Sequence, residues 1–284
     1  MTYEVLMTPG YDEDNPYYKV TESGDPAYKR NIWNAAIGLQ AVDGLEVSSY
    51  LKTLAEDNIS GRKTYDQVKD ELHKEYGGSD IVQHEADIVA ANIAEILELG
   101  GFTLSPIALL SIHERLFSDV FDKEIVGKFR KYNITKKEKI LFDDSVIYGD
   151  WNDIKPSLKF YLEDESEYHY SFPMSDDDIR HLSEFTRNIW QTHPFAEGNT
   201  RTTAVFIELY MRSLGFDINN DPFAANSLYF RNALVRACYS NPGYDVHPDY
   251  KYLDRFYSNV FSGKDNVLDN SALYINIDHE NAEC

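Results

Sequence analysis

Residues 193–201 of this 284-residue chain read His-Pro-Phe-Ala-Glu-Gly-Asn-Thr-Arg, and the two helices that they join decide the fold. Upstream, behind the favoured N-cap Ser175 and three aspartates, apolar residues recur every three or four positions: Ile179, Leu182, Phe185 and Ile189. Downstream the same spacing runs up to Gly215, where we expect a helix C-cap: Val205, Phe206, Leu209, Tyr210 and Leu214. Pro194 and Gly198 interrupt the periodicity, so the nine residues are predicted to form a tight loop between two helices.

The residue types in this loop are suited to phosphate chemistry. Asn199 is a favoured N-cap, and a helix that starts there directs backbone N–H groups and the positive end of its dipole into the loop. His193 can accept a proton from an attacking hydroxyl near neutral pH, and Glu197 is a hard oxygen ligand suited to Mg²⁺. Gly198 lets the backbone approach an anion, and Arg201 can bind phosphate oxygens in a bidentate fork. The loop therefore predicts phosphoryl or nucleotidyl transfer.

Two other interpretations of the loop are weaker. His193 and Glu197 are four residues apart, as in helical zinc motifs, but Pro194 and Gly198 break the helix that would bring them together. For any one of these residues, a place in an ordinary helix–loop–helix connection is the simpler explanation. The full string of nine argues against that explanation.

The string resembles the signature of the Fic family, His-Pro-Phe-x-(Asp/Glu)-Gly-Asn-(Gly/Lys)-Arg, whose members are mostly AMP transferases that modify a protein hydroxyl with ATP. Residues 127–134, Gly-Lys-Phe-Arg-Lys-Tyr-Asn-Ile, are similar to the segment before the family's substrate-positioning hairpin, and the resemblance covers residues 100–240. It implies that His193 is the base, that Glu197 binds Mg²⁺ and that ATP is the substrate. The nucleotide-binding positions that it implies are Phe195, Gly198, Asn199, Thr200, Arg201, Tyr229 and Phe230.

Two positions depart from the family pattern. Thr200 replaces the usual glycine or lysine, and Ala204 stands where family enzymes commonly carry a second arginine that holds the γ-phosphate. Because positions 201 and 204 lie almost one helical turn apart, we expect both side chains to face the anion site. If ATP binds in the family's ordinary pose, an arginine at position 204 is then expected to tighten ATP binding; if the site takes another donor or another cation fills this role, the arginine should bring no gain or impair activity. The family's inhibitory motif, (Ser/Thr)-x-x-x-Glu-(Gly/Asn), has no match, and its nearest fit, around Glu95, has an amphipathic helix with an exposed acid as its alternative.

Residues 138–149 are the main non-helical candidate. Two short apolar runs flank residues 143–145, Asp-Asp-Ser, which predicts a β-hairpin. In the family this position carries a flap whose edge pairs with the target segment, so the resemblance implies a target protein presented near 138–149. The alternative is an ordinary surface hairpin packed by Leu141 and Ile147.

Tyr229 and Phe230 occupy a predicted helix after the motif, where the family often places its adenine contacts. An adenine ring needs an apolar or aromatic slot, which either side chain could line. The alternative for each ring is packing in the core, because aromatic residues at helical spacing usually pack.

Composition sets the surroundings of this site. The chain has 48 acidic and 27 basic residues, a net charge of −21, which disfavours nucleic acid and anionic membranes as partners. The two cysteines make no disulfide framework, the first residues lack the features of a signal peptide, and no window approaches about 18 consecutive apolar residues. These observations predict a cytoplasmic protein. An antitoxin-like protein is a second candidate partner beside the target.

The remaining sequence is predicted to be mostly helical, with helices at 28–44, 46–58, 64–76, 79–99 and 104–119. The expected fold is all-α: a Fic-like helical bundle with a small β-hairpin flap and an N-terminal helical module. We divide it into an irregular lead-in (1–27), the helical module (28–101), a Fic-like catalytic domain (102–262) and a C-terminal tail (263–284). The acidic run at 163–167 is interpreted as a solvated helix end or loop.

The predicted function is protein adenylylation, the transfer of AMP from Mg-ATP to a Tyr, Thr or Ser hydroxyl of a target protein or of the chain itself. Two alternatives stay open. One is a Fic-like regulatory protein that binds nucleotide but turns it over weakly, because Ala204 removes a phosphate contact. The other is a relative that transfers another phosphate-containing group or acts as a kinase.

Overall fold

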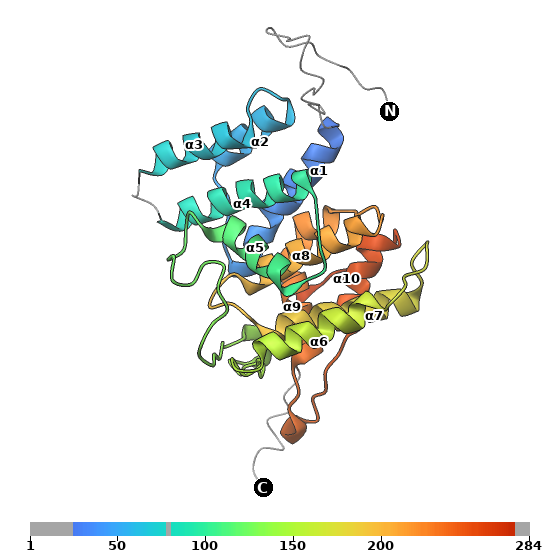
Figure 1. Ribbon diagram of the computed structural model, residues 1–284. Helices are drawn as coiled ribbons and strands as arrows, with labels where there is room; N and C mark the ends of the chain where they lie inside the picture. Colours follow the sequence, from blue (N-terminus) through green and yellow to red (C-terminus); the bar gives the residue numbers. More distant parts are fainter. Residues whose placement is uncertain (1–24, 78–80, 276–284) are drawn as a thin grey trace, which may run out of the picture.

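The computed structural model describes residues 25–77 and 81–275, and these residues form an all-α fold (Figure 1). Within them, β-structure is limited to two isolated bridges, Glu138–Asp144 and Asn241–Val246. The α-helices are α1 Pro26–Gly38, α2 Ser49–Ile59, α3 Tyr65–Tyr76, α4 Ile81–Leu99, α5 Pro106–Phe117, α6 Ile154–Ser166, α7 Asp176–Thr192, α8 Asn199–Ser213, α9 Asp221–Cys238 and α10 Lys251–Phe261. The short 3₁₀ helices are η1 Leu39–Asp43, η2 Lys139–Leu141, η3 Pro242–Tyr244 and η4 Asn270–Leu273. The all-α prediction is confirmed.

The helices on either side of the motif form as their sequence predicts. Ser175 caps α7, and its hydroxyl accepts a hydrogen bond from the backbone N–H of Asp178. Gly215 follows the end of α8 with φ +90°, the left-handed conformation of a helix-terminating glycine. The predicted N-cap of α8 is wrong by one residue, since Gly198 occupies the cap and Asn199 is the first residue of the helix. The physical reason is that the Asn199 side chain is bonded to the backbone of the preceding loop.

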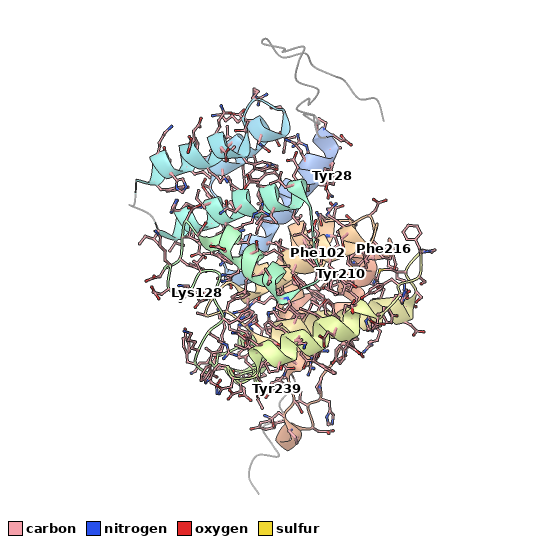
Figure 2. The ribbon with its side chains drawn as sticks, in the orientation of Figure 1. Tyr28, Phe102, Lys128, Tyr210, Phe216 and Tyr239 are labelled. Atoms are coloured by element: carbon pink, nitrogen blue, oxygen red, sulfur yellow. The ribbon has the colours of Figure 1, made fainter. Side chains whose placement is uncertain are left out.

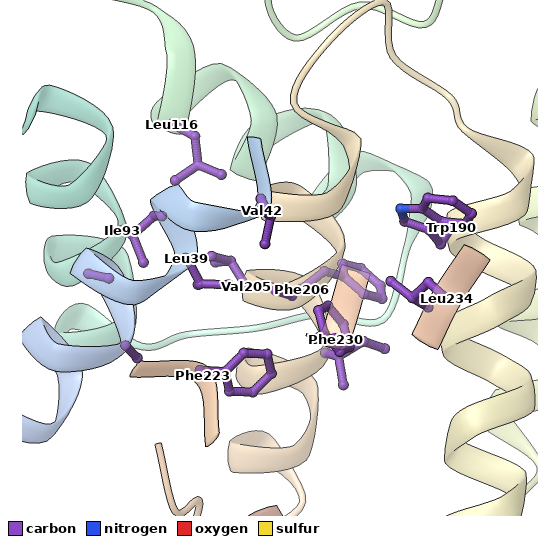
Figure 3. Close-up of a cluster of buried hydrophobic side chains, with 14 of the residues drawn as sticks. Leu39, Val42, Ile93, Leu116, Trp190, Val205, Phe206, Phe223, Phe230 and Leu234 are labelled. Atoms are coloured by element: carbon purple, nitrogen blue, oxygen red, sulfur yellow. The ribbon is translucent and has the colours of Figure 1, made fainter. Parts of the chain in front are cut away.

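Helix α8 lies at the centre of the molecule, and 13 of its 15 residues are buried. It packs against α4, α5 and α7, while α9 packs against α1, η1, α7 and α10 (Figure 1). The hydrophobic core that surrounds α8 and α9 draws side chains from both halves of the chain (Figure 3): Leu39, Val42, Ile93, Leu116, Trp190, Val205, Phe206, Phe223, Phe230 and Leu234. A side chain on α8 therefore faces protein on almost every side, which limits what the first turn of this helix can offer to a ligand.

Residues 138–149 do not form the predicted hairpin. Lys139–Leu141 is a 3₁₀ turn, and a single bridge joins Glu138 to Asp144. Ile140 and Leu141 are both buried, and they lie within the 3₁₀ turn rather than on the two faces of a strand. Ile147 is 83% exposed, so it does not pack the segment as the surface-hairpin alternative supposed. The segment is a compact loop whose turn lies at 139–143 rather than at 143–145.

The acidic run at 163–167 is also different from its interpretation. It forms the last turn of α6, but Glu165 is buried rather than solvated. Its carboxylate accepts hydrogen bonds from the hydroxyls of Tyr170 (2.7 Å) and Tyr210 (2.9 Å), and it lies 2.8 Å from Nε2 of His181. Burial raises the pKa of this carboxyl above its ordinary value. Four segments of the fold thus meet at Glu165, which the sequence predicted to be exposed to solvent.

Some predictions fall on residues that are outside the described ranges. This applies to 1–24 of the lead-in and to 276–284 of the tail, which includes Cys284. Of the rest of the lead-in, Asp25 caps α1 and Pro26 begins that helix. Cys238 is a buried free thiol. Among the described helices, none has the length together with the apolar character that a bilayer crossing requires.

Candidate active site

His193 ends helix α7 and begins the motif loop. Its backbone has the left-handed φ of 47°, which stops the helix immediately before Pro194. The residue is 8% exposed, and the ring of Tyr148 lies 4.1 Å from the imidazole between ring centroids. His193 therefore sits at a point where the chain is bent and closely covered by the loop that precedes α6.

The hydrogen bonding of His193 selects one tautomer. Its Nδ1 lies 3.1 Å from the backbone oxygen of Trp190, and because a carbonyl can only accept, Nδ1 carries the proton. Burial lowers the pKa of His193 to about 3, and the charges of Lys136, Arg130 and Arg231 act in the same direction. The imidazole is thus neutral at pH 7, with an unprotonated Nε2. No group in the described part of the chain hydrogen-bonds to that nitrogen.

Arg130 holds the end of α7 in place. Its Nε donates to the backbone oxygen of His193 at 2.7 Å, and its two terminal nitrogens donate to the oxygens of Tyr132, Gly149 and Thr192. The backbone N–H of Arg130 also donates to the oxygen of Pro194 at 2.9 Å. A single buried guanidinium thus satisfies carbonyls left unpaired at the helix end, where a positive charge is also favoured by the dipole.

The loop between residues 145 and 149 is fastened to the same end of α7. The backbone N–H of Gly149 donates to the oxygen of Gln191 at 3.0 Å, and the Gln191 amide donates to the oxygen of Ile147 at 2.9 Å. These two bonds fix Tyr148, which lies between them in sequence, over the imidazole of His193. Figure 2 labels Tyr239, whose hydroxyl donates to Asp144 at 2.7 Å and ties the same loop to the end of α9.

The first turn of α8 begins with Gly198 and Asn199, which both have structural roles, and anion binding there stays a prediction. Gly198 has φ +73°, and a Cβ at this position would lie 2.4 Å from the Phe117 ring, so only glycine fits. The Asn199 amide donates to the oxygen of Phe195 at 2.8 Å and accepts from its N–H at 2.9 Å. Within the described ranges, the N–H groups of Gly198, Asn199 and Thr200 meet no protein acceptor. Backbone N–H groups rather than the Asn199 side chain are therefore available to an anion.

Glu197 points outward from the same turn. It is exposed, and its carboxylate makes no hydrogen bond or ion pair with the described residues. Its backbone oxygen accepts a hydrogen bond from Nε2 of His113 at 3.1 Å, while Nδ1 of His113 accepts from the N–H of Gly127. The His113 ring also stacks on Phe195 at 3.9 Å. His113 thus positions the carboxylate-bearing residue, and burial lowers the pKa of its imidazole to about 4, which keeps it neutral.

The Arg201 side chain is bound by residues of η1 and α4. Its side chain is 2% exposed and donates to Glu85 at 2.7 Å and to Gln40 at 3.1 Å. Its Nε lies 3.0 Å from a carboxylate oxygen of Asp43, and the guanidinium lies over the ring of Phe117. Two carboxylates therefore already balance the positive charge of Arg201, which the sequence predicted would bind phosphate. A phosphate contact by Arg201 stays a prediction that needs one of these partners to move.

Position 204 is not at the mouth of the site. Ala204 is 1% exposed inside the helix packing, so the expectation that an arginine here would face an open anion site is wrong. Thr200 is buried as well, and its hydroxyl accepts a hydrogen bond from the Trp190 indole at 2.9 Å. The cause is the central place of α8, which leaves little of its surface free beyond the first backbone N–H groups.

Tyr229 and Phe230 belong to α9 and lie in the hydrophobic core of the protein. Their side chains are 1% and 0% exposed, and the Phe230 ring packs against Phe223, Phe256 and Tyr257. Neither ring reaches the surface, so neither is available to an adenine ring in this conformation, and the prediction of adenine contacts here is not supported. The aromatic spacing that suggested a slot is explained by packing between α9 and α10.

Sequence reasoning missed several residues that shape this site. Arg130 lies in the segment 127–134, but no role was assigned to its side chain from the sequence, because its acceptors Thr192 and His193 are more than 60 positions away. Glu138 pairs with Arg231 of α9 through two 2.8 Å bonds. His113 carried a weak signal, since it is a single histidine within the apolar spacing of the 104–119 helix. The grooves elsewhere on the surface lie away from the motif; one is lined by Tyr28, Phe102 and Phe216, which Figure 2 labels.

Comparisons with known proteins give a family match for part of the chain and a similar solved structure. Residues 103–211 match the model of the Fic/DOC family. Among solved structures, the chain is similar to the crystal structure of the N-terminal FIC domain of Bep8 protein, a VirB-translocated effector protein from Bartonella sp. 1-1C. The two share 17% sequence identity with a TM-score of 0.49, over 64% of this chain and 84% of that chain. No curated protein sequence matches the chain. Residues 103–211 therefore match the Fic/DOC family, in agreement with the resemblance of the motif at 193–201.

Proposed function

We propose that this Fic/DOC domain is a protein adenylyltransferase that moves AMP from Mg-ATP to a Tyr, Thr or Ser hydroxyl of a target protein or of the chain itself. The observation that carries the proposal is the state of His193. Its imidazole is neutral, its proton is held on Nδ1 by Trp190, and its Nε2 has no hydrogen-bond partner among the described residues, in the loop that leads into α8. Such a group can accept a proton but has none to give at Nε2.

The reaction follows from this placement. Nε2 of His193 takes the proton of the attacking hydroxyl, whose oxygen forms a bond to the α-phosphorus of ATP. The bond between that phosphorus and the oxygen bridging to the β-phosphate breaks, and pyrophosphate leaves. Backbone N–H groups at the start of α8 stabilise the negative charge on the α-phosphate oxygens. The low pKa of His193 makes it a weak base in the free protein, and bound phosphates would raise that pKa by adding negative charge nearby.

Glu197 suits the magnesium ion that usually accompanies ATP. Magnesium binds through one or two carboxylates while phosphates and water complete its coordination, so one exposed carboxylate that no described residue engages fits this need. In the described residues, no cluster of three or more His, Cys, Asp and Glu side chains offers a complete metal site. The ion would neutralise phosphate charge and help to orient the nucleotide.

The target protein is proposed to approach beside residues 138–149. Ile147 is exposed at the edge of this loop, near Tyr148 and His193. Since the loop has only one bridge in place of two strands, recognition by its side chains is a better match than extended strand addition. An antitoxin-like partner remains a proposal that rests on the family alone.

A second function is favoured by one observation. Arg201 is neutralised by Glu85 and Asp43, and Ala204 is buried, so neither position offers a free cation to ATP. A domain that binds nucleotide weakly and acts as a regulatory protein would also have these features. Within the proposed family activity, transfer of a different phosphate-containing group or a kinase reaction also remains open.

Incubation with ATP labelled at the α- or the γ-phosphate separates these functions. Transfer of the α-label to protein, lost in His193→Ala, supports adenylylation. Transfer of the γ-label alone indicates a kinase and would replace the proposal. ATP binding without transfer of either label would leave the regulatory function, while the His193→Ala variant shows whether any transfer depends on the proposed base.

A further inference from the structure

The cations near His193 differ in whether protein groups already pair with their positive charge. Three of them lower the pKa of His193 by their charge, namely Arg130, Arg231 and Lys136. Arg130 donates to four backbone oxygens, and Arg231 is paired with Glu138 by two bonds. Lys136 is exposed, and its ammonium makes no ion pair or hydrogen bond with a described residue. Among these three, only Lys136 has a positive charge free to meet a ligand.

The backbone around Lys136 is fixed in relation to the base. Its N–H donates to the hydroxyl of Ser145 at 3.2 Å, and Ser145 lies three residues before Tyr148, the ring on His193. Two residues after Lys136, Glu138 is joined to α9 through Arg231. The ammonium is therefore carried by a loop that is tied down on both sides of it, while its own side chain remains free to move.

The local charge also stands out from the rest of the chain. Residues 128–139 contain six basic residues and one acidic residue, and that acid is the buried Glu138. The chain as a whole has a net charge of −21. A highly acidic surface repels a polyanion such as ATP except where cations gather, so an anionic ligand should be drawn to this segment.

We propose that Lys136 is the cation that binds the phosphate oxygens of the nucleotide, in place of the motif arginines. Arg201 is engaged by Glu85 and Asp43, and position 204 is buried, so the site needs positive charge from outside α8. A flexible lysine whose ammonium has three donors can contact a phosphate group as a point charge. The inference rests on the proposed function only in taking ATP as the ligand.

The test measures ATP binding by calorimetry in the full chain, with Mg²⁺ present. Lys136→Met should weaken ATP binding by about tenfold, the size of one charge-assisted phosphate contact, and Lys136→Arg should retain most of the affinity. Lys137→Met is the matched control, because it removes the same charge from an exposed neighbouring lysine. That variant should stay within about twofold of the wild type, since charges at a distance are screened by salt.

Several outcomes would overturn the inference. Equal ATP affinities in Lys136→Met and the wild type, or equal losses in Lys136→Met and Lys137→Met, would show that Lys136 makes no specific contact. Unchanged ATP binding with impaired label transfer to an acidic tyrosine peptide would assign Lys136 to the target instead. Absence of ATP binding in the wild type would refute this inference together with the proposed function. A Lys136-dependent ATP affinity without any label transfer would refute adenylylation and leave the phosphate site standing.

Discussion

The Nε of Arg130 donates to the backbone oxygen of His193 at 2.7 Å, so a buried guanidinium 63 positions earlier in the chain fixes the residue proposed as the base. The same side chain holds the oxygens of Thr192 and Gly149, which belong to the helix end and to the loop that covers the imidazole. Because His193 adopts a left-handed backbone conformation, its orientation depends on such contacts more than on the helix that precedes it.

Arg130→Met should therefore reduce both stability and transfer. The substitution leaves four carbonyl oxygens without their donor, which should lower the free energy of unfolding by about 3 kcal/mol. Label transfer at saturating ATP should fall at least about tenfold, as expected when a base is displaced by a fraction of an ångström to an ångström. Urea unfolding and single-turnover transfer measure the two effects.

Two variants of Arg130 and its neighbour sharpen this test. Arg130→Lys should recover only part of the loss, because an ammonium cannot reproduce the planar fork that reaches four oxygens. Lys131→Met removes an exposed charge next to Arg130 and should leave unfolding within about 0.5 kcal/mol of the wild type. Equal unfolding midpoints for Arg130→Met and Lys131→Met would show that the four bonds do not hold the loop.

The pKa of His193 gives a signed prediction for stability against pH. Its folded-state pKa of about 3 lies below the ordinary histidine value, so the unfolded chain binds the proton first as the pH falls. The folded state is thus favoured in full above pH about 6.5 and loses this contribution between that pH and about 3. In His193→Gln, the free energy of unfolding should decline less steeply over this window.

Urea unfolding at several pH values between 7 and 4 tests the prediction. His113 has a pKa lowered in the same direction and remains in both proteins, so the difference between the two curves isolates His193. Parallel curves would mean that folding does not shift the pKa of His193, so that the imidazole is not held neutral between pH 4 and 6 as proposed. The acid limb of transfer activity should likewise lie below pH about 5 rather than near 6.5.

Glu85→Gln tests whether the partners of Arg201 restrain it. The substitution removes one of two carboxylates beside a guanidinium that is 2% exposed, so unfolding should become easier by about 1–2 kcal/mol. The remaining positive charge near the first turn of α8 should also tighten ATP binding by about twofold to fivefold. Calorimetry with ATP and urea unfolding read the two consequences separately.

Glu95→Gln is the matched control on the same helix. Glu95 was the nearest fit to the family's inhibitory motif, but it pairs with Lys69 at 3.0 Å and belongs to the packing of α3 on α4. Its loss should leave ATP affinity unchanged. If Glu85→Gln and Glu95→Gln affect ATP binding equally, the restraint on Arg201 has no bearing on the nucleotide.

Glu197→Gln should weaken magnesium-dependent ATP binding while leaving stability almost unchanged. The carboxylate is exposed and makes no protein contact in the described structure, so its removal costs the fold little, whereas an amide is a poorer ligand for a hard cation. A higher magnesium concentration should restore part of the affinity. ATP titrations at low and high Mg²⁺ check this, and Glu163→Gln, which changes an exposed acid on α6, is the control. If ATP binding by the wild type and by Glu197→Gln is equally independent of Mg²⁺, Glu197 is not a magnesium ligand.

The sequence predicted the features that depend on local patterns, namely helices, their caps and the loop between them. The apolar spacing and caps of α7 and α8 were visible in residues 175–215, and the proline and glycine of the motif marked the loop between them. Helix α10 was missed although Leu253, Phe256, Tyr257 and Val260 have the same spacing, so its signal was present and unused. Contacts of charged residues across the fold gave no signal at all. Arg201 could not be placed because its direction depends on Glu85, which is 116 positions away.

For Ala204→Arg, the structure predicts a different outcome from the one that the sequence predicted. The sequence placed position 204 beside an open phosphate site, where an added arginine would tighten ATP binding. In the fold, Ala204 is 1% exposed on a helix that packs against α4, α5 and α7. A guanidinium there must displace core side chains and bring a charge into a region where Glu85 and Asp43 already serve Arg201, which costs about 3 kcal/mol or more.

We therefore expect Ala204→Arg to unfold at a clearly lower urea concentration than the wild type and to gain no ATP affinity. Ala204→Ser keeps the side chain small and should lose much less stability, which separates the effect of size and charge from that of any change at this position. Urea unfolding of both variants, followed by ATP calorimetry on the folded protein, decides between the two views. Tighter ATP binding by a fully stable Ala204→Arg would show that position 204 opens to the phosphates after all, and that Lys136 is not needed to replace a motif arginine.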